Sequence, residues 1–189
     1  MSDEDLVLAV QAGDTQSFGE LVARWQQPLY RFVSRVSSRP EDAHDVCQET
    51  FVRILRNANG YRKGARFSTW MYQIALNLCR DQTRRRRRWS LIVDETRDAG
   101  DSPTPRGEVA RHDPELAVER REMADAVGRA LDEIPREQRE VLILKEFEGL
   151  KFREIAEILD CPESTVKSRM YYGLSGLREA LARQGIHNA

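Results

Sequence analysis

The segment from residue 67 to residue 88 interleaves aromatic side chains with positive charges. It opens with FSTWMYQIALN, which contains Trp70 and Tyr72, and it runs into five consecutive arginines, residues 84–88. Unstacked bases bind to flat side chains and their phosphates bind to cations, and one stacked base is worth roughly 1–3 kcal/mol. The residue types therefore predict a surface for single-stranded nucleic acid. The alternatives are a helix core for Trp70 and Tyr72 and a solvated helix end for the arginines.

Near the C-terminus, the sequence predicts a helix over 151–159, a turn over 160–162 and a longer helix over 164–183. This order is typical of a helix-turn-helix, whose second helix enters the major groove of DNA. Helical spacing assigns the inner faces of the two helices to Ile155, Ala156, Leu159, Val166, Met170, Leu174 and Leu177.

A second face of the longer helix is left for binding. Lys167, Ser168, Tyr171 and Tyr172 follow at i, i+1, i+4 and i+5, where they can reach base edges. Ser164 and Thr165 lie at the positive end of the helix and suit a phosphate. The alternative is that these polar residues only solvate an amphipathic helix.

Acidic side chains form a stripe on another predicted helix. Asp42, Asp45 and Glu49 are spaced i, i+3 and i+7, beside Gln48. Charge is segregated along the chain, because residues 62–88 carry a net +8 and residues 1–49 a net −5 within a total of −1. The stripe therefore indicates either a solvated face or a docking surface for a basic partner. We expect no metal there, because His44 points off the stripe.

Apolar residues recur at helical spacing almost throughout, which predicts an all-α chain. We expect two small helical domains, 1–90 and 114–185, joined by a flexible linker over 91–113 that is rich in Asp, Gly, Ser, Thr and Pro. In the first domain, helices are expected to begin after Asp14, at Pro28, at Pro40 and at a cap on Ser68 or Thr69, with an end at Asn59-Gly60.

Several classes of function lack support in the sequence. The three cysteines are far apart, and no apolar run approaches the roughly 20 residues of a membrane span, so we expect a soluble, cytoplasmic protein. No phosphate-binding glycine motif and no nucleophile constellation occurs. We therefore expect no catalytic residues, no metal and no cofactor.

The helix-turn-helix residues LKFREIAEIL, followed by CP and TVKSR, resemble region 4 of extracytoplasmic-function sigma factors. The resemblance implies that the longer helix reads the minus-35 promoter element, with Lys167, Ser168 and Tyr171 on base-reading positions. Tyr172 stands where the family often has a basic residue.

The ten residues DAHDVCQETF, from Asp42 to Phe51, resemble sigma region 2.2. That region grips the largest subunit of RNA polymerase, so the resemblance implies that Asp42, Asp45, Gln48 and Glu49 bind the core enzyme. His44 stands where an acidic residue is typical.

The aromatic segment and the arginines after it resemble sigma regions 2.3 and 2.4, which hold melted minus-10 DNA. The resemblance implies that the loop 59–66 captures a flipped-out base and that Trp70 lies at the upstream edge of the bubble, with Met71 in place of a second tryptophan. The residues expected at the minus-10 element are Tyr61, Lys63, Phe67, Trp70, Asn77, Arg80 and Arg84.

Together these matches imply an alternative sigma factor with three partners: the beta and beta-prime subunits of core RNA polymerase, promoter DNA as duplex and as melted non-template strand, and an anti-sigma factor. Two alternatives stay open. One is a helix-turn-helix regulator that acts without polymerase, and the other is a sigma mimic that titrates an anti-sigma factor.

Overall fold

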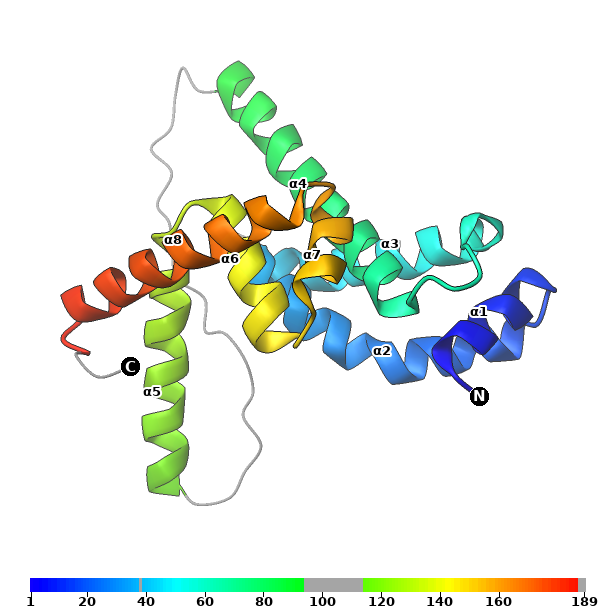
Figure 1. Ribbon diagram of the computed structural model, residues 1–189, viewed down its shortest axis with the longest axis horizontal. Helices are drawn as coiled ribbons and strands as arrows, with labels where there is room; N and C mark the ends of the chain where they lie inside the picture. The colour runs from blue at the N-terminus through cyan, green and yellow to red at the C-terminus, as the bar shows by residue number, and fades with distance from the viewer. Residues whose placement is uncertain (38, 94–113, 187–189) are drawn as a thin grey trace. The chain divides into compact units, whose positions relative to one another are not determined.

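A computed structural model describes the backbone of residues 1–37, 39–93 and 114–186 and, among these, the side chains outside residues 40, 90–93 and 114–121 (Figure 1). The chain divides into two compact units, Met1–Pro103 and Thr104–Ala189. All regular structure within the described ranges is helical, which confirms the prediction of an all-α chain. Most of the predicted linker, residues 94–113, lies outside the described residues.

The first unit is a bundle of helices packed on one long helix, α2. Its elements are α1 (Asp3–Gln11), α2 (Thr15–Val36), η1 (Pro40–Asp42), α3 (Ala43–Arg56), η2 (Ala58–Gly60) and α4 (Phe67–Val93). Helices α1, α3 and α4 each contact α2, and α4 also packs on α3. Its largest fully buried side chains are Leu6, Leu21, Leu29, Phe32, Ile54, Phe67, Met71 and Leu76.

Side chains cap the first two helices. Ser2 Oγ accepts from the N–H of Asp5, and the Asp5 carboxylate accepts from the N–H of Ser2, which makes a reciprocal capping box. Asp14 accepts from the hydroxyl of Ser17 at 2.7 Å and from the N–H of Gln16 at 2.9 Å, which confirms it as the cap of α2. These hydrogen bonds, that from the Ser17 hydroxyl above all, hold the pKa of Asp14 below its usual value.

The prediction that a helix begins at Pro28 is wrong, because α2 continues through it. Proline has no N–H, so the carbonyl of Arg24 loses its usual helical donor at a cost of about 3 kcal/mol. Leu21 before Pro28, together with Leu29 and Phe32 after it, is fully buried, and each such burial stabilises by roughly 1.5–3 kcal/mol. Tertiary packing therefore outweighs the local preference.

Two further boundaries differ from the predicted ones. Helix α3 ends at Arg56, and Asn59-Gly60 lies in the 3-10 turn η2 rather than at a helix cap. Helix α4 begins at Phe67, so neither Ser68 nor Thr69 is its cap. It continues to Val93, three residues into the segment predicted as linker.

The second unit contains α5 (Pro114–Asp132), α6 (Arg136–Leu142), the π-helical turn η3 (Ile143–Phe147), α7 (Phe152–Leu159) and α8 (Glu163–Arg183). Helix α8 contacts α5, α6 and α7. It lies close to α6 at Gly173, where a Cβ atom would lie 3.1 Å from the Leu142 side chain. Leu174, predicted to lie in the core, is 42% exposed, because Gly173 is the residue that faces α6.

Helix α6 carries a charged residue into the core of the second unit. Glu140 is 1% exposed, and the Nε of Arg136 donates to its Oε1 at 2.8 Å. On the next turn, Arg139 pairs with Asp132 at 2.9 Å. The buried Glu140 carboxylate needs its hydrogen bond from Arg136, because an unpaired buried carboxylate carries a large desolvation penalty.

Replacing Glu140 with glutamine should therefore lower the free energy of unfolding of this unit by about 1 kcal/mol, since the hydrogen bond from Arg136 loses its charge assistance inside the core. Hydrogen exchange of the α6 and α8 amides in the full chain measures this unit separately. Glu137→Gln, on the exposed side of the same helix, is the matched control and should change the value by less than about 0.5 kcal/mol. Equal effects of the two substitutions would contradict the assignment.

Candidate functional site

The acidic stripe of α3 is divided in the structure. Asp42, just before the helix, has a side chain only 17% exposed, and its Oδ2 lies 2.5 Å from a guanidinium nitrogen of Arg86 on α4. The contact is an ion pair without hydrogen-bond geometry, since the same oxygen accepts no hydrogen bond. Asp42 is therefore engaged within the bundle, and its partner belongs to the arginine run.

The other members of the stripe face solvent. Asp45 and Gln48 are exposed, and Glu49 is partly exposed while it accepts from the Nε of Arg53 one turn later at 3.0 Å. His44 is exposed and its ring lies 4.6 Å from the ring of Tyr30 on α2. Asp45 and Glu49 thus present negative charge on an accessible helix face.

Two residues predicted to contact DNA lie in the core instead. Phe67 is fully buried against the ring of Trp25, and Tyr61 is 6% exposed with its hydroxyl donating to the carbonyl of Ala65. Burial, with a contribution from the Glu4 carboxylate, raises the pKa of Tyr61. Neither ring is accessible in this conformation, and their contact with the minus-10 element stays a prediction.

Accessible groups do follow one face of α4. Trp70 is half-buried, Asn77 is exposed, Arg80 is half-buried and Arg84 is exposed. At 100° per residue these four positions fall within one side of the helix, along about 21 Å of its length. Tyr72, in contrast, is buried with its ring 4.6 Å from that of Phe32, so the core alternative holds for it.

Buried rings hold Trp70 in place. Its ring lies 5.3 Å from the ring of Tyr61 and 6.4 Å from that of Phe67. Lys63 is exposed in the loop that precedes α4. Tyr61 and Phe67 therefore pack against the buried side of the Trp70 ring. The accessible members of the predicted minus-10 set are Lys63 and the residues on the α4 face.

The five consecutive arginines, residues 84–88, lie in the C-terminal part of α4. All five arginines are exposed, and Trp89 after them is 69% exposed. Arg84 pairs with Asp81 at 3.3 Å and Arg86 with Asp42. Like charges three and four residues apart destabilise a helix, so a polyanion bound here would relieve their repulsion.

The helix-turn-helix is formed as predicted. Asp160 closes α7 in the left-handed conformation, with φ of 51°, and Pro162 precedes the first residue of α8. Ile155, Leu159, Val166 and Met170 are buried between the helices, while Ala156 and Leu177 are partly buried. The turn and this small shared core together fix the position of α7 relative to α8.

The predicted reading face of α8 is accessible. Ser164, Lys167 and Ser168 are exposed, Thr165 is partly exposed, and Tyr171 and Tyr172 are 71% and 61% exposed. The two tyrosine rings meet edge to face at 5.5 Å. Lys167 pairs with Glu163 at 2.8 Å, and the Ser168 hydroxyl donates to the Thr165 carbonyl at 2.9 Å. Two large exposed aromatic rings beside a lysine suit recognition of base edges.

Comparisons with known proteins agree with this arrangement. Residues 21–89 match Sigma-70 region 2 and residues 124–175 match Sigma-70, region 4. The RNA polymerase sigma-H factor of Pseudomonas aeruginosa is 34% identical over 95% of this chain and 93% of its own length. The ECF RNA polymerase sigma-E factor of Haemophilus influenzae is 33% identical over 90% of each chain. The chain is an ECF sigma factor.

Solved structures show the same fold. The sigma factor RpoE of Bartonella quintana, crystallised with the anti-sigma factor NepR, superposes with a TM-score of 0.73 at 23% identity, covering 89% of this sigma factor and 98% of that chain. CnrH, solved with the cytosolic domain of CnrY, superposes with a TM-score of 0.68 at 23% identity over 97% and 99%. The helical fold predicted from the family resemblance is confirmed.

Sequence reasoning missed the Asp42–Arg86 pair of this sigma factor, because no spacing rule relates residues 44 positions apart. Arg86→Met leaves the nearly buried Asp42 carboxylate without that cation, so we expect the free energy of unfolding of the first unit to fall by about 1 kcal/mol. Urea unfolding followed by tryptophan fluorescence reports this unit, since all three tryptophans lie in it.

Arg85→Met is the matched control, because Arg85 is exposed and belongs to the same run. In a double-mutant cycle, Asp42→Asn should remove most of the effect of Arg86→Met. If Arg85→Met and Arg86→Met destabilise the unit equally, the ion pair contributes nothing to stability.

Proposed function

We propose that this sigma factor binds core RNA polymerase, recognises the minus-35 and minus-10 promoter elements and promotes strand opening for transcription initiation. The observation that carries the proposal is the presence, within one ECF sigma chain, of an exposed acidic face on α3 and an exposed aromatic-basic face on α4, together with an exposed reading face on α8. The acidic face has the charge that binding to the core enzyme requires, and the other two faces have the side-chain types that suit melted minus-10 DNA and duplex minus-35 DNA.

Polymerase docks on α3 in this scheme. Asp45, Gln48 and Glu49 offer the accessible carboxylates and amide to basic groups of the core enzyme, in which the beta and beta-prime subunits are the expected partners. Asp42 contributes less to docking than these three residues, because it is held by Arg86. Exposed charge pairs of this kind set orientation and association rate.

The α4 face holds the melted minus-10 element of the non-template strand. Trp70 stacks on an unpaired base, Lys63 and Asn77 contact the bases nearby, and Arg80 and Arg84 contact phosphates. Stacking of one base is worth roughly 1–3 kcal/mol, which matches the loss of one or two duplex stacking steps of about 1.4 kcal/mol each. Base capture can thus drive opening without nucleotide hydrolysis, and the sigma factor needs no catalytic residues of its own.

Duplex DNA at minus-35 is read by α8. Ser164 and Thr165 bind a phosphate at the start of the helix, and the bases are read by Lys167, Ser168, Tyr171 and Tyr172. A lysine suits the acceptors of guanine, and an aromatic ring suits the methyl group of thymine.

An anti-sigma factor is a further proposed partner. The two solved structures described above are complexes: RpoE is bound to NepR, and CnrH is bound to the cytosolic domain of CnrY. Within the described residues, no helix is long and apolar enough to cross a membrane. We propose that the protein acts in the cell interior, because the RNA polymerase that it is proposed to bind works there.

Run-off transcription with purified core polymerase and a promoter library tests the proposal. We expect promoter-specific transcripts only when the sigma factor is added. A helix-turn-helix regulator would instead bind duplex DNA specifically by itself, and a sigma mimic would bind an anti-sigma factor without directing any transcript. Absence of every promoter-specific transcript would overturn the proposal.

Charge reversal on α3 should separate docking from folding. We expect Asp45→Lys, alone or with Glu49→Lys, to weaken core binding at least tenfold, because attraction to a basic surface becomes repulsion. Titration of labelled core enzyme measures the affinity, and circular dichroism checks the fold. Glu41→Lys, an exposed acidic residue on the adjacent turn, is the matched control and should bind normally. Unchanged binding by Asp45→Lys would refute the assignment of this face.

Promoter preference should change when side chains on the reading face of α8 are replaced with alanine. We expect Lys167→Ala and Tyr171→Ala to alter the selected minus-35 sequence, with a loss of discrimination of roughly 1–3 kcal/mol at each contacted base pair. Selection from a randomised minus-35 library with reconstituted holoenzyme measures it. Arg178→Ala, also exposed on α8 but more than one turn beyond Tyr172, should leave the selected sequence unchanged. An identical preference in all variants would show that other residues read the element.

A further inference from the structure

The loop between α3 and α4 is held from the first helix of the chain. The side-chain amide of Gln11, the last residue of α1, donates to the carbonyl of Ala58 at 2.7 Å and to that of Tyr61 at 3.1 Å. Both carbonyls lie beyond the end of α3. The Ala58 carbonyl also accepts from the N–H of Tyr61 at 2.9 Å within the 3-10 turn η2, so Gln11 gives it a second donor. Gln11 is partly buried, so these hydrogen bonds are shielded from water.

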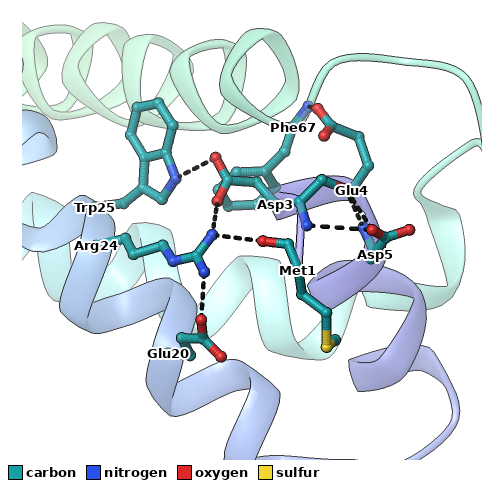
Figure 2. Close-up of polar contacts among 9 residues, drawn as sticks. Met1, Asp3, Glu4, Asp5, Glu20, Arg24, Trp25 and Phe67 are labelled. Carbon is teal, nitrogen blue, oxygen red and sulfur yellow. Dashed lines mark hydrogen bonds and ion pairs between the residues drawn. The ribbon is translucent and has the colours of Figure 1, made fainter.

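The same helix also contacts the start of α4. Glu4 Oε1 accepts from the N–H of Phe67 at 3.2 Å, across 63 residues of sequence. The first N–H groups of a helix have no acceptor within it, and a carboxylate is favourable at that positive end. Figure 2 shows Glu4 reaching the backbone nitrogen of Phe67. A residue of α1 therefore performs the capping role predicted for Ser68 or Thr69.

Between these two attachments the loop is closed on itself. The buried Tyr61 donates its hydroxyl to the carbonyl of Ala65, and the N–H of Ala65 donates to the carbonyl of Arg62 at 3.1 Å. Gly64 supports the turn with φ of 96°, a conformation that other residues rarely adopt. Residues 62–66 are all exposed, so a basic loop of fixed shape is presented beside Trp70.

Helix α1 does not depend on the loop for its own position. Asp3 accepts from the Nε1 of Trp25 and from Arg24, each at 3.0 Å, and Arg24 also donates to the Met1 carbonyl (Figure 2). Leu6, Val7 and Val10 bury its apolar face. Removal of the Gln11 or Glu4 contacts should therefore release the loop while leaving α1 in place.

We infer that Gln11 and Glu4 are positioning residues of the minus-10 site: they hold the loop 61–66 and the first turn of α4 in the shape that receives the melted strand. The inference rests on the proposed function of that surface. Ordering a free loop costs conformational entropy, so a loop that is ordered before DNA arrives loses less of the free energy of DNA binding. Neither residue touches the DNA in this scheme.

The test uses full-length sigma factor reconstituted with core polymerase. Its probe is a fork-junction DNA with a single-stranded minus-10 element, compared with the same DNA carrying an abasic site at each minus-10 position in turn. In the wild type, loss of a captured base weakens binding. We expect Gln11→Met, which keeps the length of the side chain but has no donor, to bind intact DNA roughly tenfold more weakly and to bind the abasic DNA as the wild type does.

Glu4 supplies a conservative pair. Glu4→Gln keeps an oxygen that can accept from the Phe67 N–H, so it should retain base discrimination, whereas Glu4→Met should lose it. Asp3→Asn is the matched control, because it weakens the attachment of α1 to α2 without touching the loop, and it should discriminate like the wild type. Hydrogen exchange of free Gln11→Met should increase at residues 58–66 but not within α1.

The inference is overturned if Gln11→Met discriminates abasic from intact DNA as well as the wild type does. It is also overturned if binding of both DNAs falls equally, or if Asp3→Asn reproduces the effect, since either result indicates general destabilisation. A wild-type holoenzyme that shows no sensitive minus-10 position would refute the proposed function of the α4 surface, and the inference with it. Normal discrimination in the wild type alongside an unaffected Gln11→Met would remove only the role of α1.

Discussion

Burial of one face of α4 is the constraint on which the first unit depends. Phe67, Met71, Ala75 and Leu76 are completely buried against the rest of the bundle, and this packing sets the rotation of the helix about its axis. Because the helix is rigid and continuous to Val93, the rotation also determines which way Trp70, Asn77 and Arg84 face. The surface proposed for DNA is therefore a geometric consequence of the core.

Much of this architecture could be predicted from local pattern. Apolar periodicity indicated the helical class, Asp14 marked the start of α2, and the turn over 160–162 gave the helix-turn-helix. Polar and charged side chains were also expected to be accessible, and Asp45, Asn77 and Lys167 are indeed exposed. These features depend on residues within one or two turns of each other.

The features that escaped prediction depend on distant residues. Continuation of α2 through Pro28 is decided by the burial of Leu29 and Phe32 in the bundle, which no local rule weighs. Tyr61 and Phe67 were expected at the minus-10 element from the family resemblance, but their burial could not be predicted, because aromatic residues suit both a core and a stacking surface. The roles of Gln11 and Glu4 follow from contacts across about 50 or more positions.

The ion pair between Asp42 and Arg86 bears on how DNA binding responds to salt. Each arginine that neutralises a phosphate normally releases condensed counterions, so affinity falls with salt in proportion to the number of such contacts. Arg86 already has an anionic neighbour inside the protein, and a phosphate that binds it must displace a carboxylate as well as water. If the run binds phosphates as proposed, its five arginines are therefore not equivalent contacts, and the salt dependence of DNA binding should correspond to fewer than five cations.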